Sequence, residues 1–567
     1  MVNIKINDIE YQVPENITVL EACRYAGIRI PTLCYLKDIN QIGACRICVV
    51  EIKGARSLAA ACTHPINEGM EIYTNSPAVR KSRKTSLELI LSTHERKCLS
   101  CVRSQNCELQ ALAAEFGCDE TAYEGDRETY DIDDSTEYLI RDNNKCILCR
   151  RCVAACKNQH VGVIGANDRG FKTHISSAFE LGLKDVPCVA CGQCIAVCPV
   201  GALREKDEID NVLAAINNPK KHVRVAIGEE FGYPVGTNTK GKMVSALKKC
   251  GFDKVFDVNF SADLTIMEEG TEFLERLSNG GTLPMITSCS PGWIKFCEHY
   301  YPELLDNLSS CKSPQQMFGA VIKTYYAEKN GIDPEDIYMV SVMPCTAKKF
   351  EKTRDDQSAA GVPDIDSVLT TRELARLIKR AGIMYQTLED EEFDNPLGTG
   401  TGAAVIFGAT GGVMEAALRT VAEIVDKKPL DSLEFTEVRG VKGIKEASYE
   451  IGGNEVKVAV ASGLSNAKIL MDKVKNGECD YHFIEIMGCP GGCVNGGGPI
   501  FPADIRNVID IRAVRAASIY EEDKNLPIRK SHENPVITQI YDEYFEKPGS
   551  HKAHKILHTK YVKRDRY

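Results

Sequence analysis

The chain has 567 residues, too many for a single hydrophobic core, so several domains are expected. Its formal net charge of −10 argues against nucleic-acid binding, which depends on cations that neutralise phosphates. No apolar run approaches the roughly 18 residues of a membrane span, and the first residues lack the features of a signal peptide. We therefore predict a cytoplasmic protein without a membrane span. Most of its 25 cysteines are clustered at short spacings, which in a reducing compartment indicate metal sites rather than disulfides.

Residues 1–78 are predicted to form a β-rich module. VNIKINDIEYQV reads as a hairpin that turns at Asn7–Asp8, and a capping box of Thr18 and Glu21 begins a short helix. Four cysteines, with the spacing C-x10-C-x2-C-x13-C, are the candidate ligands: Cys34, Cys45, Cys48 and Cys62. Four thiolates also suit zinc. The strand-rich context and GACRIC resemble a plant-type 2Fe–2S ferredoxin module with a β-grasp fold, although the spacing differs from the plant pattern.

Residues 79–118 contain a second set of candidate ligands. They follow the pattern His-x3-Cys-x2-Cys-x5-Cys: His94, Cys98, Cys101 and Cys107. This spacing suits either zinc or an iron–sulfur cluster. The position between two other cluster modules favours a 4Fe–4S cluster with one histidine and three cysteine ligands.

Residues 138–208 contain an internal repeat, CILCRRCVAAC and CVACGQCIAVCP. Both copies have the C-x2-C-x2-C-x3-C spacing of bacterial two-cluster ferredoxins, in which the fourth cysteine of one run binds the other cluster. The first predicted 4Fe–4S cluster is bound by Cys146, Cys149, Cys152 and Cys198, and the second by Cys156, Cys188, Cys191 and Cys194.

Residues 211–505 show short apolar runs alternating with amphipathic helices, which predicts a large α/β domain within a multidomain chain of mixed α/β and α+β class. The expected strands are VRVAIG, DKVFDV, PMITS, YMVSVMP, AAVIF, VKVAVASG and YHFIEIMG; the expected helices include TIMEEGTEFLERLSNG and TTRELARLIKRAG. Three motifs follow strands, at the edge where open α/β sheets place their sites: TSCSPGW at 287–293, MPCTAKKFE at 343–351 and EIMGCPGGCVNGGGP at 485–499.

These motifs resemble the signature segments of iron–iron (FeFe) hydrogenases, and the resemblance extends along the whole chain. Residues 506–567 are similar to the family's small-subunit segment. The resemblance implies an H-cluster, in which a 4Fe–4S cubane shares a cysteine sulfur with a diiron unit that carries CO, cyanide and a dithiolate. By position, Cys345, Cys489 and Cys493 match cubane ligands, Cys493 being the shared sulfur.

The same resemblance assigns three residues around the diiron unit. Lys348 matches a residue that donates to a cyanide, a role that suits a cation beside an anionic ligand. Met343 and Met487 match soft side chains that line the diiron pocket, although methionines more often simply fill a core.

A proton route is also implied. Glu269, Glu272 and Arg276 lie at i, i+3 and i+7 of a predicted helix, a spacing that by itself indicates a solvated charged face. In the family the matching positions, with Ser309 and a cysteine beside the cluster, relay protons, and such groups need hydrogen-bond reach and suitable pKa values.

The first motif departs from the family, which usually has two adjacent cysteines there. Strict register makes Cys289 the proton-relay cysteine and puts Ser290 at a cubane-ligand position. A thiolate is, however, a far better iron ligand than a serine hydroxyl. We therefore favour a slip of one residue that makes Cys289 the ligand and Ser290 the proton carrier, with a serine-oxygen ligand as the alternative.

The activity implied is the reversible reduction of protons to H2, with ferredoxin as electron partner and dedicated maturation proteins to build the diiron unit. The alternative is an electron-relay or hydrogen-sensing subunit of a larger NAD(H)-linked complex with flavoprotein subunits. The first 205 residues also resemble the large iron–sulfur subunit of NADH dehydrogenase, but the three later motifs argue against that class.

Overall fold

The computed structural model describes residues 1–227, 240–499 and 503–566, and the chain divides into two units. The first unit comprises residues 1–186, 193–204 and 503–510; the second comprises 187–192, 205–227, 240–499 and 511–566. No helix in the described ranges combines the length and the apolar character needed to cross a membrane.

The N-terminal part of the first unit is a five-stranded sheet in the order β2-β1-β5-β3-β4. These strands are β1 (Val2–Ile6), β2 (Ile9–Val13), β3 (Val49–Ile52), β4 (Ala59–Ala60) and β5 (Glu71–Tyr73). The predicted hairpin is confirmed: Asn7 and Asp8 have φ values of 51° and 67°, as a tight two-residue turn requires. Thr18 and Glu21 form the predicted capping box at the start of α1 (Val19–Tyr25).

Short helices and strands form the rest of the first unit. They are α2 (Pro77–Thr93), α3 (Glu108–Glu115), β6 (Leu139–Arg141), α4 (Arg151–Asn158), β7 (Gly165–Asn167), β8 (His174–Ser176), α5 (Gln193–Val197), β9 (Leu203–Glu205) and α17 (Ala503–Arg506). Arg151, fully buried on α4, connects α4 with α3 and with the N-terminal part of the unit. It donates to Glu108 on α3 and to the carbonyl oxygen of Tyr35.

The second unit is built on two four-stranded sheets. The first is parallel, in the order β11-β10-β13-β14, and comprises β10 (His222–Ile227), β11 (Lys254–Asp257), β13 (Ile337–Met343) and β14 (Ser367–Thr370). The second, in the order β12-β17-β16-β15, comprises β12 (Met285–Ile286), β15 (Ile444–Ile451), β16 (Asn454–Ser462) and β17 (Phe483–Met487); only β15 is antiparallel to its neighbour.

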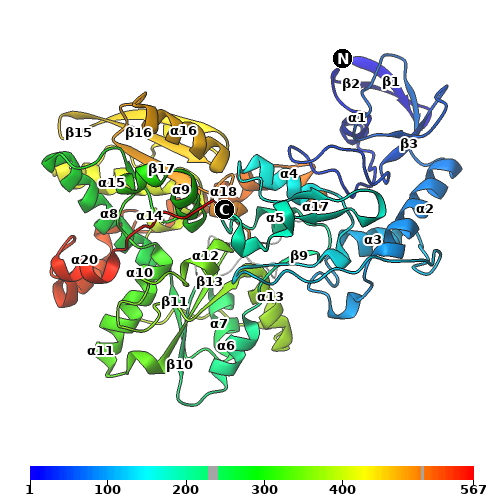
Figure 1. Ribbon diagram of the computed structural model, residues 1–567. Helices are drawn as coiled ribbons and strands as arrows, with labels where there is room; N and C mark the ends of the chain where they lie inside the picture. The colour runs from blue at the N-terminus through cyan, green and yellow to red at the C-terminus, as the bar shows by residue number, and fades with distance from the viewer. Residues whose placement is uncertain (228–239, 500–502, 567) are drawn as a thin grey trace. The chain divides into compact units, whose positions relative to one another are not determined.

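Helices cover both faces of the parallel sheet. Figure 1 shows α6 (Ile209–Ile216), α7 (Lys240–Cys250) and α13 (Thr371–Arg380) on one face, and α10 (Pro314–Val321) and α11 (Ala327–Asn330) on the other. Successive strand residues point to opposite faces, so Val225 and Ala226 of β10 belong to two different hydrophobic clusters. Burial on both faces explains the continuous apolar runs of these strands.

The remaining helices of the second unit are α8 (Asn259–Asn279), α9 (Pro291–Tyr300), α12 (Ala347–Glu351), α14 (Gly402–Val405), α15 (Gly412–Asp426), α16 (Leu464–Asn476), α18 (Ile511–Asn525), α19 (Pro535–Ile540) and α20 (His551–Leu557).

The strand predicted from AAVIF is wrong, because this segment lies in α14 and the helical turn after it. Its residues are buried on all sides, and a short apolar run of this kind does not distinguish a strand from a buried helix. The other predicted strands and both helices are present in the described residues, whereas β14 and β15 were not predicted.

A buried cluster of ion pairs links α15 to α18 within the second unit. Arg419 of α15 is fully buried and donates to Glu415, one turn earlier, and to both oxygens of Asp523 on α18. Arg419→Met is expected to lower the free energy of unfolding by up to about 3–5 kcal/mol, because it removes the buried cation shared by Glu415 and Asp523. These carboxylates then keep the partly exposed Arg439 and Arg529 as partners.

This prediction is checked by circular dichroism during thermal unfolding of the full chain. Arg380→Met is the matched control, because its partner Asp210 and Arg380 itself are exposed, and we expect a change of at most about 1 kcal/mol. Equal shifts for the two variants would contradict the role assigned to Arg419.

Candidate metal centre and proton route

The three strand-end motifs of the second unit meet at one cavity. Met343 ends β13, Met487 ends β17, and Cys289 follows shortly after β12. The cavity is lined mainly by apolar atoms. It therefore lies at the carboxyl ends of strands, where open α/β sheets hold their ligands.

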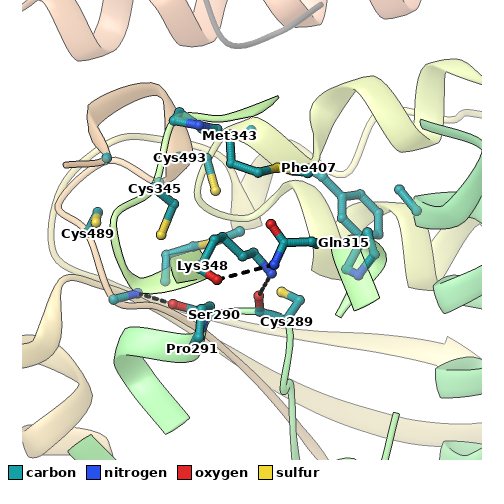
Figure 2. A pocket seen from close by; sticks show the side chains of 18 of the residues that line it. Cys289, Ser290, Pro291, Gln315, Met343, Cys345, Lys348, Phe407, Cys489 and Cys493 are labelled. Atoms are coloured by element: carbon teal, nitrogen blue, oxygen red, sulfur yellow. Dashed lines mark hydrogen bonds between the residues drawn. The ribbon is translucent and has the colours of Figure 1, made fainter. Parts of the chain in front are cut away.

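Four cysteines line this cavity, together with Ser290. Figure 2 shows Cys345, Cys489 and Cys493 on one side of it, whereas the sulfur of Cys289 lies toward Lys348 and Gln315. None of these four cysteines forms a disulfide in the described residues, so the arrangement is a set of soft metal donors in an apolar chamber.

The other end of the cavity carries buried polar groups. The Lys348 ammonium donates to the carbonyl oxygen of Cys289 at 3.3 Å and to Glu351 at 3.0 Å. Gln315 also donates to Glu351, while its own side-chain oxygen is buried with no hydrogen-bond partner among the described residues. A cation and an amide are thus held against the place where an anionic ligand would need them.

Gln315 and Glu351 were missed by the sequence analysis. The Ser313–Pro314 pair does signal a helix start, but it does not show that the next residue faces a cavity assembled from distant motifs. Glu351 lies inside the second motif, but besides Lys348, three residues earlier on the same helix, it accepts hydrogen bonds from Ser313 and Gln315 at the start of α10.

The predicted relay residues lie on α8 and on the segment that contains Ser309. Glu269 is fully buried, and burial raises its pKa to about 8, against a smaller lowering by the Ser309 hydroxyl. Both carboxylate oxygens of Glu269 lack a hydrogen-bond partner among the described residues. Ser309 instead donates to Glu272 at 3.2 Å, and Arg276 donates to Glu272 at 2.6 Å. Burial likewise raises the pKa of the Cys289 thiol, and Glu269 raises it further. These groups run from the cavity toward the partly exposed Arg276.

A second chain of hydrogen bonds, not predicted from sequence, leads from Glu272 to the C-terminal segment. Ser310 donates to Glu272 at 3.1 Å, and its hydroxyl pairs with Nδ1 of His558 at 2.7 Å. Nε2 of His558 in turn lies 3.1 Å from Glu268, which accepts the hydroxyl of Tyr541 at 2.5 Å. These pairs could not be predicted from local patterns, because the partners in Ser310–His558 and Glu268–Tyr541 are more than 240 residues apart in sequence.

In the first unit, the structure brings members of two predicted ligand sets close to one another. The backbone N–H of Cys34 donates to the sulfur of Cys45 at 3.3 Å, and Cys48 and Cys62 form a second close pair. Burial raises the pKa of the Cys152 thiol, and the nearby Cys149, Cys146 and Cys198 raise it further, so these four thiols lie close together. Both groupings agree with shared clusters.

The other two predicted ligand sets are the one that contains His94 and the one that contains Cys156. His94 is 8% exposed, and its Nδ1 has no hydrogen-bond partner in the described part of the chain, which suits a ligand. The three cysteines predicted to accompany it, Cys98, Cys101 and Cys107, are half-buried free thiols. Of the fourth set, Cys156 and Cys194 belong to the first unit and Cys188 and Cys191 to the second, so this set stays a prediction.

Within the second unit, residues 187–192 pack against the catalytic motifs. The Thr346 hydroxyl donates to the carbonyl oxygen of Ala190 at 2.7 Å. The sulfur of Cys489 approaches the carbonyl oxygen of Cys191 to 4.0 Å. A predicted cluster-binding loop thus touches a predicted cubane ligand.

Comparison with known proteins agrees with this geometry. Residues 215–497 match the family described as iron only hydrogenase large subunit, C-terminal domain, and residues 509–564 match the iron hydrogenase small subunit. The chain is 48% identical to the NADP-reducing hydrogenase subunit HndD of Solidesulfovibrio fructosivorans over the full length of both. The chain belongs to the iron-only (FeFe) hydrogenase family.

Other relatives and solved structures support this membership. Iron hydrogenase 1 of Clostridium pasteurianum is 46% identical over 99% of this chain and all of that protein. A solved structure of a variant of the FeFe hydrogenase HydA1 from Chlamydomonas reinhardtii is 41% identical, with a TM-score of 0.57, over 64% of this chain and all of that one.

The N-terminal regions of this FeFe hydrogenase family member match iron–sulfur families. Residues 1–77 match a 2Fe-2S iron-sulfur cluster binding domain, 83–122 the NADH-ubiquinone oxidoreductase-G iron-sulfur binding region, and 145–202 a 4Fe-4S dicluster domain. The prediction of a mixed α/β, multidomain iron–sulfur hydrogenase is thus confirmed, while the β-grasp and bacterial-ferredoxin descriptions of its modules stay predictions.

Proposed function

We propose that this chain interconverts protons and H2 reversibly at an H-cluster held in the cavity of the second unit. The observation that carries the proposal is one chamber that combines soft donors, a buried cation and the inner end of a series of proton-carrying side chains. When bound, the H-cluster supplies the redox chemistry, through a 4Fe–4S cubane joined to a diiron unit with CO, cyanide and a dithiolate.

The side chains around the cavity would hold this group. The sulfurs of Cys345, Cys489 and Cys493 suit the cubane, and the Lys348 ammonium suits an anionic cyanide. Met343 and Met487 would pack against the diiron unit and help exclude water.

The proton route runs between the Cys289 sulfur and the Arg276 edge of α8. With its pKa raised to about 8, the Glu269 carboxyl holds a proton near neutral pH and can pass it on. Ser309 and Glu272, joined by a hydrogen bond, would continue the route toward the surface. A water would bridge Ser309 to Glu269, because the carboxylate oxygens of Glu269 have no hydrogen-bond partner among the described residues. Arg276 holds Glu272 in place by its ion pair.

Electrons would travel through one 2Fe–2S and three accessory 4Fe–4S clusters, bound by the four ligand sets predicted above. The contact of Cys191 with Cys489 supports delivery to the cubane through residues 187–192. We also propose a cytoplasmic location and five regions along the chain, with the boundaries 1–78, 79–118, 138–208, 211–505 and 506–567.

Two electron partners fit the chain. A soluble ferredoxin is the first. A multi-subunit complex that uses NAD(P)(H) is the second, favoured by the full-length similarity to a chain named as a subunit of an NADP-reducing hydrogenase. Dedicated maturation proteins would assemble the diiron unit in either case.

The test is H2 evolution from reduced methyl viologen by the full chain, co-expressed with maturation proteins and with its iron content measured. Vigorous H2 production is expected. Protein with all its iron but no H2 production would overturn the proposal and favour an electron-relay or hydrogen-sensing role. Replacing the viologen with reduced ferredoxin, or with NADPH and co-purified subunits, then identifies the partner.

A further inference from the structure

We propose that the Ser290 oxygen, rather than the Cys289 sulfur, binds the fourth iron of the cubane, which this chain would hold through three thiolates and one alkoxide. The assignment rests on the proposed function only in placing an H-cluster cubane in the cavity. Coordination exchanges the O–H bond of Ser290 for an Fe–O bond and releases one proton to solvent, and no electron is transferred.

The first observation is that Ser290 precedes a helix without capping it. Ser76 and Ser313 also stand before a proline that begins a helix, with ψ near 160°, and both hydroxyls accept the backbone N–H three residues further on. Ser290 has φ −100° and ψ 98° and makes no such bond. Its hydroxyl oxygen instead accepts the N–H of Gly488, in the third motif, at 3.2 Å and lines the cavity.

The second observation is that Ser290 and Cys289 face different parts of the cavity. The backbone of Ser290 is extended, and consecutive side chains of an extended segment point to opposite sides. Figure 2 shows the Ser290 hydroxyl beneath Cys345 and Cys489, and the Cys289 sulfur toward Gln315. Only one of the two neighbours can therefore complete the cysteine set.

The third observation is that the register of this segment is held firmly. A slip of one residue, which would exchange the two side chains, must break hydrogen bonds on both sides of it and displace Pro291 from the first position of α9. The bonds are Thr287 N–H to Ile484 O at 3.0 Å, Trp293 Nε1–H to Thr287 O at 3.2 Å, Ser288 hydroxyl to Cys311 O at 2.7 Å, and Lys348 ammonium to Cys289 O at 3.3 Å.

The surroundings of Ser290 also favour an anionic oxygen. The N–H of Gly488 points at it, and a hydrogen bond to a charged acceptor is stronger than one to a neutral hydroxyl. Ser290 stands at the N-terminus of the ten-residue helix α9, whose dipole favours negative charge there. An alkoxide is a harder ligand than a thiolate and stabilises oxidised iron. The cubane of this chain should therefore have a lower potential than that of its Ser290→Cys variant.

The experiment compares Ser290→Ala, Ser290→Cys and Cys289→Ala with the wild-type full chain, all produced without the maturation proteins so that no diiron unit is present. The readouts are iron per chain, the EPR spectrum of the reduced protein and the reduction potential of the cubane. Ser76→Ala, the same change at another Ser-Pro helix start, is the matched control and should keep all its iron. Circular dichroism verifies the fold of each variant.

We expect Ser290→Ala to lose four iron atoms per chain, the content of one 4Fe–4S cluster, together with the EPR signal of the cubane. Ser290→Cys should keep the iron and show a changed EPR signal and a higher reduction potential. Cys289→Ala should leave the iron content, the EPR signal and the potential unchanged. Loss of the cubane in Cys289→Ala or in Ser290→Cys, or full iron with an unchanged signal in Ser290→Ala, would overturn the assignment. Because none of these readouts needs H2 production, a wild type without activity would refute the proposed function and leave this result standing.

Discussion

Replacing Glu269 by glutamine is expected to slow H2 evolution by about 10²–10⁴-fold, the usual contribution of a positioned proton donor. The substitution keeps the size of this fully buried side chain but removes the group that gains and loses a proton. Viologen-driven H2 evolution by the matured variant, normalised to iron content, measures the effect. Glu275→Gln on the exposed face of α8 is the matched control and should keep the wild-type rate.

The pH dependence of the wild type follows from the same residue. Burial raises the pKa of Glu269 to about 8, so below that pH the carboxyl carries a proton that it can give up. Where proton delivery limits the rate, H2 evolution should fall as pH rises through about 8, and H2 oxidation, which needs the carboxylate as acceptor, should rise over the same range. Both inflections should vanish in Glu269→Gln. A variant with the wild-type rate and profile would exclude Glu269 from the route.

Replacing Cys493 by alanine is expected to abolish H2 evolution. The loss should exceed the ~10–100-fold decrease that follows removal of a residue that only hydrogen-bonds to a metal ligand. Cys493 lines the cavity and is proposed to provide the sulfur shared by the two halves of the H-cluster. The measurements are the H2 evolution rate and, by infrared spectroscopy, the CO and cyanide bands of the matured protein, which should disappear.

Cys297→Ala is the matched control for this variant. Cys297 is a fully buried thiol on α9 that is not among the residues lining the cavity. We expect this control to retain both the infrared bands and the activity. An active Cys493→Ala variant with intact bands would show that the shared sulfur has been assigned to the wrong residue.

Local patterns were sufficient for the modules and for most elements. The capping box of Thr18 and Glu21 and the turn at Asn7–Asp8 depend on interactions a few residues apart, and both are present as predicted. The prediction from AAVIF failed because packing on all sides, rather than periodicity, decides between helix and strand there. The edge strand β15 was missed although Ala447, Tyr449 and Ile451 alternate with polar residues, a pattern that is typical of a half-buried strand.

The sequence by itself determined which donors this protein has, because the spacing of its cysteines and its three motifs are local properties of the chain. The tertiary structure decided what the donors can do. The raised pKa of Glu269 results from burial by distant segments, and the buried amide of Gln315 matters only because α10 meets the second motif at the cavity. The contrasting directions of Cys289 and Ser290, adjacent in sequence, depend on hydrogen bonds to residues nearly 200 positions away. Such contacts form only when the sheets bring the three motifs to one edge, so the spacing of residues along the sequence does not predict them.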